Sequence, residues 1–137
     1  MALIFDTGPL IAYLDAGDGD HDRCRVLIDE TVEARLVPLT VLVEVEYHMR
    51  RVGHPSGFAQ LLADFERGAF RLLDLSTQWL LRAGEVLERY QDLGLGLVDA
   101  SIVAATEMLS EPKVATLDHR HFAVVRPAHV DALTLLP

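Results

Sequence analysis

Ala2-Leu3-Ile4-Phe5 is a short apolar run, and Asp6-Thr7-Gly8-Pro9 follows it directly. An apolar run of this length, bounded by Gly and Pro, predicts a fully buried strand of a parallel sheet. In open α/β sheets, ligands bind beyond the carboxyl ends of such strands. The sequence therefore places a carboxylate, Asp6, and a hydroxyl, Thr7, where a binding site is expected.

Short apolar segments alternate with helical patterns along the rest of the chain. Helical spacing of apolar residues predicts helices at residues 10–14, 21–32, 40–52, 58–65, 78–90 and 98–109. Thr40 is the predicted N-cap of the helix at 40–52, and Ser76 is the predicted N-cap of the helix at 78–90. Further strands are predicted at residues 35–39, 70–75, 114–117 and 124–125. This alternation predicts an α/β fold with three layers, α/β/α, around a short, mainly parallel central sheet.

The length and the cysteine content set further bounds. A chain of 137 residues is most simply one domain, residues 1–137, with room for a substantial core. A single cysteine cannot form an internal disulfide, which favours a reducing compartment. No apolar stretch approaches the ~18 residues that span a bilayer, and no signal peptide is recognisable, so we expect a cytoplasmic protein without membrane contact.

The formal net charge of −9 limits the possible partners. It argues against a protein that coats nucleic acid, because affinity for the phosphate backbone comes mainly from Lys and Arg. It does not exclude an enzyme that acts on nucleic acid, since acids gathered around a divalent cation present a different local charge. A basic partner protein is the other natural complement of an acidic domain.

Two further aspartates are placed like functional residues. Asp118 directly follows the strand predicted at 114–117, and a parallel arrangement with the first strand brings it to the same sheet edge as Asp6. Asp99 shares a helix face with Ile102 and Val103, so its carboxylate lies over an apolar stripe and needs a partner. Taken singly, each aspartate is equally explained as a cap or turn residue.

The helix predicted at 40–52 offers two glutamates, Glu44 and Glu46, which lie ~200° apart around the helix axis. Only one of them can face a site shared with the aspartates. Periodicity does not choose between them. Together with one of these glutamates, Asp6, Asp99 and Asp118 make an oxygen-only donor set, which suits Mg²⁺ or Mn²⁺ and not Zn²⁺.

Four segments of the sequence resemble the acidic motifs of PIN-domain nucleases in their order and spacing. They read LIFDT at 3–7, VLVEV at 41–45, GLVDASIVAATE at 96–107 and ATLDHRHF at 115–122. The spacing is similar to that of VapC-type toxins of toxin–antitoxin pairs, while residues 51–92 carry no matching motif. One departure is Gly8, where such proteins often carry a hydroxyl or an amide side chain.

The resemblance implies a metal-dependent endoribonuclease toxin with Asp6, Glu44, Asp99 and Asp118 as catalytic and metal-binding residues, and thus selects Glu44 over Glu46. It also implies Thr116 as a supporting hydroxyl. The implied cofactor is Mg²⁺ or Mn²⁺. The implied partners are an RNA substrate, with tRNA and rRNA as candidates, a VapB-like antitoxin, and a second copy of the chain in a homodimer.

Three other interpretations fit parts of the sequence. An aspartic protease half-site requires a β-rich chain with strands ahead of its Asp-Thr-Gly motif, and here the motif begins at residue 6. A receiver-like Mg²⁺-binding phospho-acceptor domain would use Asp74 as acceptor, but needs a Lys after a late strand, whereas Lys113 precedes its strand. A catalytically inactive PIN-like binding module has no reason to retain all four acids.

Overall fold

Strand β1 (Ala2–Phe5) lies at the centre of the sheet, as its unbroken apolar sequence predicts. The computed structural model describes residues 1–137, and all four residues of β1 are buried. β1 pairs in parallel with β2 (Ala34–Pro38) on one side and with β4 (Lys113–Ala115) on the other. A strand enclosed in this way tolerates only apolar side chains, so the first carboxylate appears where the strand ends.

The sheet has five strands in the order β3-β2-β1-β4-β5, and all of its pairings are parallel. β3 (Arg71–Leu73) and β5 (Thr134–Leu136) are the edge strands. The predicted short, mainly parallel sheet with the N-terminal strand at its centre is confirmed. Because β1 and β4 are parallel neighbours, Asp6 and Asp118 leave the sheet at the same edge.

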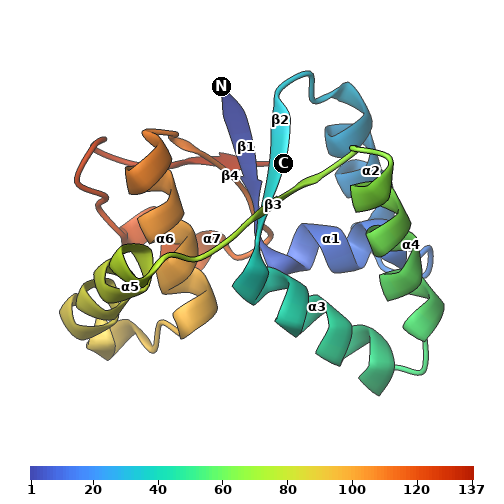
Figure 1. Ribbon diagram of the computed structural model, residues 1–137, viewed down its shortest axis with the longest axis horizontal. Helices are drawn as coiled ribbons and strands as arrows, with labels where there is room; N and C mark the ends of the chain where they lie inside the picture. Colours follow the sequence, from blue (N-terminus) through green and yellow to red (C-terminus); the bar gives the residue numbers. More distant parts are fainter.

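Helices cover both faces of the sheet and complete the predicted three layers (Figure 1). Helices α1 to α4 lie on one side of the sheet, and α5 to α7 lie on the other. No helix has the length and apolar content that crossing a membrane requires. The helices are α1 (Thr7–Leu14), α2 (His21–Glu30), α3 (Leu39–Arg51), α4 (Pro55–Glu66), α5 (Thr77–Arg89), α6 (Leu97–Leu109) and α7 (His119–Val124), with a 3₁₀ turn, η1 (Gln91–Leu93), before α6.

The hydrophobic core lies between these layers and is continuous, with 28 buried residues in one cluster. Helix α6 is enclosed most completely, since every residue from Ala100 to Thr106 is buried. Helix α5 packs along its outer side, where Trp79 Nε1–H donates to the carbonyl oxygen of Ser101 at 3.0 Å. The helix that carries Asp99 is therefore held between the sheet and α5.

Of the helix caps predicted at Thr40 and Ser76, the one at Ser76 is correct. The Ser76 hydroxyl accepts a backbone N–H in the first turn of α5, as predicted. Thr40 does not cap α3, because this helix already begins at Leu39, directly after Pro38. Proline fixes the backbone φ angle and thereby defines the start of the helix. The Thr40 hydroxyl lies instead 2.7 Å from the Ser101 hydroxyl and joins α3 to α6.

The strand predicted at residues 124–125 is wrong. Val124 ends the short helix α7, and the last strand of the sheet is β5, which the sequence did not predict. The six residues of α7 are too few for apolar periodicity to distinguish a helix from a strand. β5 has three residues, of which none is fully buried, so its sequence carries no clear alternation.

Candidate active site

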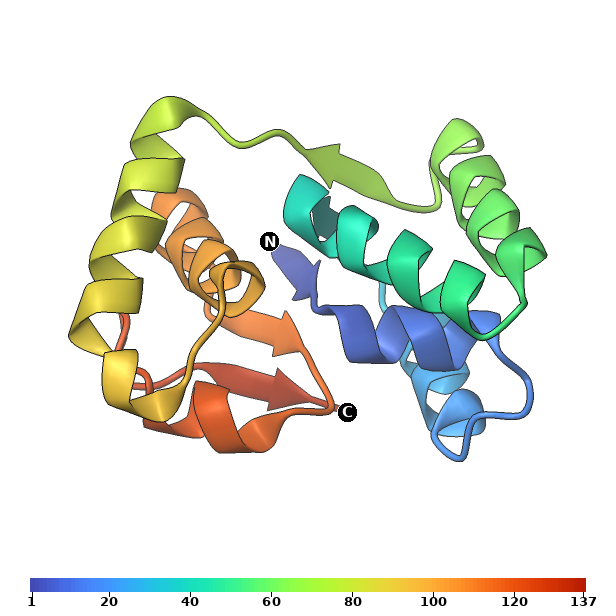
Figure 2. The ribbon, with the colours of Figure 1, turned by 90° about the horizontal axis from the view of Figure 1, so that it is seen from below.

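The four acids that the sequence singles out line one cavity of about 680 Å³. Asp6 follows β1, Glu44 lies on α3, Asp99 on the first turn of α6, and Asp118 between β4 and α7. Figure 2 looks onto this edge of the sheet, where β1 passes into α1 between α3 and α6. Elements far apart in the sequence thus bring four carboxylates together.

Asp6 is the most buried of the four, with 7% of its surface exposed. Its Oδ1 accepts the backbone N–H of Thr7 at 2.7 Å, and its Oδ2 accepts the Thr116 hydroxyl at 2.8 Å. The pKa of Asp6 is raised to about 6, mainly by burial; the two hydrogen bonds act against this rise, and the charges of Asp99 and Glu44 add to it. A buried carboxylate that repels its neighbours in this way favours a nearby cation.

Asp99 is half-buried, as its position on an apolar helix face predicts. Ile102 and Val103, which share that face, are fully enclosed in the core. Burial raises the pKa of the Asp99 carboxyl, and the charges of Asp118 and Glu44 add to this, while a hydrogen bond with His121 acts in the opposite direction. The four acids therefore act on one another electrostatically.

Thr116 connects two of the acids. Its side chain is fully buried, and its hydroxyl donates to Asp6 Oδ2 while accepting the backbone N–H of Asp118 at 3.0 Å. The contact with Asp6 agrees with the supporting role that the resemblance implied. One hydroxyl thereby fixes the Asp6 carboxylate relative to the backbone that carries Asp118.

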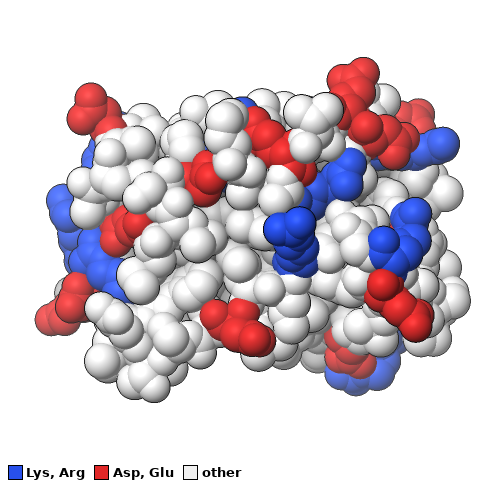
Figure 3. Space-filling model, turned by 45° about the horizontal axis from the view of Figure 1, so that its top comes forward, with Lys and Arg blue, Asp and Glu red and all other residues white.

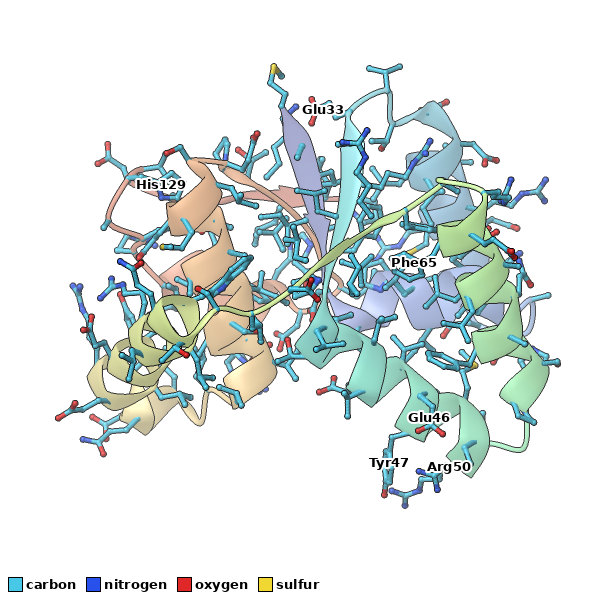
Figure 4. All side chains as sticks on the ribbon, in the orientation of Figure 1. Glu33, Glu46, Tyr47, Arg50, Phe65 and His129 are labelled. Carbon is cyan, nitrogen blue, oxygen red and sulfur yellow. The ribbon has the colours of Figure 1, made fainter.

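The structure separates Glu44 from Glu46, which periodicity left open. Glu44 lines the cavity with the three aspartates. Glu46 lies on the outer side of α3 with Tyr47 and Arg50 (Figure 4), and its Oε1 is 2.9 Å from the Nε of Arg50. Glu44 is therefore the glutamate in a position to share a ligand with the aspartates.

His121 contacts two of the four acids, and the sequence did not single it out. Its Nδ1 lies 3.2 Å from Asp99 Oδ2 and 3.1 Å from Asp118 Oδ2. The side chain is 15% exposed. The spacing of three residues from Asp118 to His121 is the sequence signal for this contact, since such residues share a helix face.

The beginning of α1 completes the cavity wall. Gly8 lies there beside Leu117, whose Cβ would be 3.4 Å from any Cβ added at position 8. The Thr7 hydroxyl is buried, lines the cavity and has no hydrogen-bond partner within the protein. Gly8 contributes no polar side chain here. The polar side chains at the start of α1 are therefore those of Asp6 and Thr7.

A divalent cation fits this set of donors. Carboxylate oxygens are the ligands that Mg²⁺ and Mn²⁺ prefer, and the raised pKa values of Asp6 and Asp99 reflect burial and mutual repulsion that a cation would relieve. Asp99, Asp118 and His121 each offer a ligand atom, and these atoms all lie within 4.8 Å of one another. The cavity therefore combines space, charge and ligand atoms for metal-assisted chemistry.

Arg50 and Arg126 are surface residues whose guanidinium groups have local partners. Arg50 pairs with Glu46, and Arg126 Nη1 donates to the carbonyl oxygens of Ala123 and Val125. On the face shown in Figure 3, acidic and basic side chains are interspersed. The cavity acids are thus a more distinctive feature than any basic patch on this face.

Comparison with known proteins agrees with this arrangement. The model of the PIN domain family matches residues 3–126. Ribonuclease VapC26 of Mycobacterium tuberculosis is 32% identical over 136 residues, which cover 98% of this chain and 100% of that protein.

Solved structures of related fold come from the same group of proteins. The Mycobacterium tuberculosis toxin VapC20, which cleaves the sarcin–ricin loop, matches with a TM-score of 0.82 at 19% identity, covering 93% of this chain and 98% of its own. VapBC2 from Rickettsia felis, bound to a DNA fragment from its promoter, matches with a TM-score of 0.71 at 15% identity over 100% of both chains. The chain therefore belongs to the PIN domain family, among the VapC-type proteins.

Proposed function

We propose that the chain is the endoribonuclease toxin of a type II toxin–antitoxin pair, and that it hydrolyses RNA phosphodiester bonds with a divalent cation. The full-length relationship to a protein named as a ribonuclease supports the activity. We further propose that residues 1–137 act as one nuclease domain in the cytoplasm. The single continuous core supports the proposal of one domain.

The observation that carries the proposal is the convergence of Asp6, Glu44, Asp99 and Asp118 on one cavity. Each acid alone has an ordinary structural explanation, such as a helix cap or a solvated helix face. A fold that only needed caps would have no reason to gather the four carboxylates against their mutual repulsion. We therefore assign all four as catalytic and metal-binding residues.

The roles of the residues follow from their burial. When bound, a divalent cation supplies Lewis-acid chemistry, which polarises the phosphodiester and makes water a stronger nucleophile. Asp6 and Asp99, the more buried acids, would hold the cation from within the cavity. Glu44 is exposed and Asp118 is 40% exposed, so these two can also reach water and the incoming RNA backbone. The Thr116 hydroxyl keeps the Asp6 carboxylate oriented.

We propose Mg²⁺ or Mn²⁺ as the ion, since the four acids provide only oxygen ligands.

For the substrate we propose single-stranded RNA or RNA loops, with tRNA and rRNA as candidates. The structures of VapB–VapC pairs among the related folds support a VapB-like antitoxin as partner. Leu97, an exposed apolar residue that lines the cavity with the acids, gives an antitoxin segment or a second toxin copy surface to cover.

The geometry argues against a receiver-like domain. Lys113 begins β4 and pairs with Glu33, at the edge of the sheet opposite the acids. Asp74 follows the edge strand β3 and does not line the cavity. The inactive-module interpretation fits the fold equally well, and RNA cleavage distinguishes it from the proposed nuclease.

Cleavage of RNA by purified variants tests the proposal. Asp6→Asn and Asp99→Asn should each abolish Mg²⁺- or Mn²⁺-dependent cleavage while the far-ultraviolet circular dichroism spectrum stays that of the wild type. Glu44→Gln should reduce cleavage strongly, whereas Glu46→Gln, the same change two residues along α3, should leave it intact. Cleavage that survives Asp99→Asn, or that needs no divalent ion, would overturn the proposal.

A further inference from the structure

We propose that His121 binds the divalent cation directly through its Nδ1, as a nitrogen ligand beside Asp99 and Asp118, and that it makes the site prefer Mn²⁺ to Mg²⁺. The inference rests on the proposed function, because it concerns the same metal site. It adds a ligand outside the acidic set and a choice between the two ions.

The first support is the position of the imidazole. Asp118 precedes α7 and His121 lies one turn into it, so the two side chains lie on the same side of the helix. Asp99 approaches from α6, which is fixed by the core. The Nδ1 atom is nearly equidistant from the two carboxylates, at 3.2 Å from Asp99 Oδ2 and 3.1 Å from Asp118 Oδ2.

The second support is that these distances suit ligands around one ion. With metal–ligand distances of about 2.1 Å, neighbouring ligand atoms of an octahedral site lie about 3 Å apart and opposite ones about 4.2 Å apart. The ligand atoms of Asp99, Asp118 and His121 all lie within 4.8 Å of one another. An ion can therefore bind all three with little movement of the backbone.

The third support is the chemistry of the donors. Mg²⁺ binds oxygen, keeps several of its waters and tolerates little departure from its preferred geometry. First-row transition ions accept imidazole nitrogen far more readily than Mg²⁺ does. A site with two carboxylates and one imidazole should therefore favour Mn²⁺, whereas the four acids alone would accept either ion.

A hydrogen-bonding role for His121 predicts different behaviour. In that role Nδ1–H donates to the two carboxylates and only orients them, so the loss of His121 would weaken Mg²⁺ and Mn²⁺ binding alike. As a ligand, the imidazole presents the Nδ1 lone pair to the ion and carries its proton on Nε2. The ratio of Mn²⁺ to Mg²⁺ affinity separates the two roles.

The experiment measures Mn²⁺ binding at one fixed pH by electron paramagnetic resonance, from the signal of free Mn²⁺, with Mg²⁺ as competitor. Four proteins are compared: wild type, His121→Gln, Asp99→Asn and the control His119→Gln, which changes an exposed histidine of the same helix. Pulsed measurements on the Mn²⁺-loaded wild type report directly on a coordinated nitrogen. This second readout requires no variant and thus no assumption about folding.

We expect the wild type to show ¹⁴N coupling to Mn²⁺ and His119→Gln to retain it. Loss of even an outer partner of a metal ligand weakens binding roughly 10–100-fold, so His121→Gln should weaken Mn²⁺ binding at least about tenfold. Mg²⁺ binding should change much less.

One outcome would overturn the inference and leave the nuclease proposal standing. In that outcome Mn²⁺ binds to the wild type without ¹⁴N coupling, and Asp99→Asn abolishes the binding. His121→Gln then leaves the ratio of Mn²⁺ to Mg²⁺ affinity unchanged. If the wild type binds neither ion, both fail.

Discussion

Asp6 shows how its surroundings change the ionisation of a single carboxylate. The carboxylate lies at the end of a buried strand, accepts two hydrogen bonds and faces other acids across the cavity. Burial is the main reason that its pKa rises to about 6, so its ionisation costs free energy in the metal-free protein. A cation reverses this balance by stabilising the ionised form.

The pH dependence of stability should reveal this cost. In the unfolded chain the pKa of Asp6 returns to its ordinary value of 3.8, so the folded protein holds a proton between pH 4 and 6 that the unfolded chain has lost. The stabilisation associated with that proton is fully present below pH 3.8 and is lost as the pH rises through 6, an effect of about 3 kcal/mol. Urea unfolding of metal-free protein at several pH values should show this fall in the wild type relative to Asp6→Asn.

Saturating Mg²⁺ or Mn²⁺ provides the control, because it should remove the fall or reverse it. A constant difference in unfolding free energy between wild type and Asp6→Asn from pH 4 to pH 7 would contradict the raised pKa of Asp6.

For single residues, the sequence best predicts the positions of those that directly follow a predicted strand. Asp6 and Asp118 follow strands, so the fold alone brings them together. Glu44 could not be separated from Glu46 by periodicity, because both lie off the centre of the apolar stripe of α3. The spacing of His121 from Asp118 is visible in the sequence, but its contact with Asp99 on another helix cannot be read from either segment alone.

Among the elements, the pair α5 and α6 is joined by an ion pair as well as by apolar packing. Arg82 on α5 contacts Glu107 on α6 through two bonds, Nε to Oε2 at 2.6 Å and Nη2 to Oε1 at 2.9 Å. Burial alone would raise the pKa of Glu107, but its hydrogen bonds with Arg82 and the Ala128 backbone outweigh this and the pKa is lowered. Glu107 thus fastens α6 to two other parts of the chain.

Glu107→Gln should destabilise the protein by roughly 1–3 kcal/mol, because it leaves the partly buried Arg82 without its charged partner. The free energy of unfolding in urea measures this. The matched control is Glu85→Gln, which removes the exposed partner of the same arginine, 66% exposed, and should cost less than about 1 kcal/mol. Equal losses in the two variants would mean that the α5–α6 ion pair adds no more than a surface contact.

Short elements account for the errors in secondary structure. Helix α7 and strand β5 have six and three residues, so neither carries enough periodicity to be recognised. The longer helices α3, α5 and α6 each have 13 residues, and their spacing predicted them to within a residue or two. The start of α3 was predicted less well, because the sequence offers both Pro38 and Thr40 as residues at which the helix could begin.

For the whole molecule, the parallel sheet both organises the core and assembles the site. The proposed ligands follow β1 and β4 or lie on α3 and α6, so an ion held by them would join the helical layers on both sides of the sheet. Binding that involves only the folded state should therefore stabilise the molecule as a unit. The alternation of segments predicted this architecture, whereas the order of the edge strands was left open.

Thermal unfolding with and without Mn²⁺ tests this coupling. At a free ion concentration 100 times the Kd, the wild type should gain about 2.7 kcal/mol, or roughly 10 °C in Tm. Glu46→Gln should show the same gain, because Glu46 faces away from the cavity. A gain of similar size in Asp99→Asn would show that the ion binds elsewhere on the acidic surface.

The contact between Thr116 and Asp6 has a consequence for synthesis of the chain on the ribosome. The two residues are 110 positions apart, and the strand that leads to Thr116 inserts beside β1 only after α1 to α6 have been made. A nascent chain thus carries Asp6, Glu44 and Asp99 before the proposed site can be completed. The order of translation therefore completes the proposed four-acid site last, when Asp118 has been made.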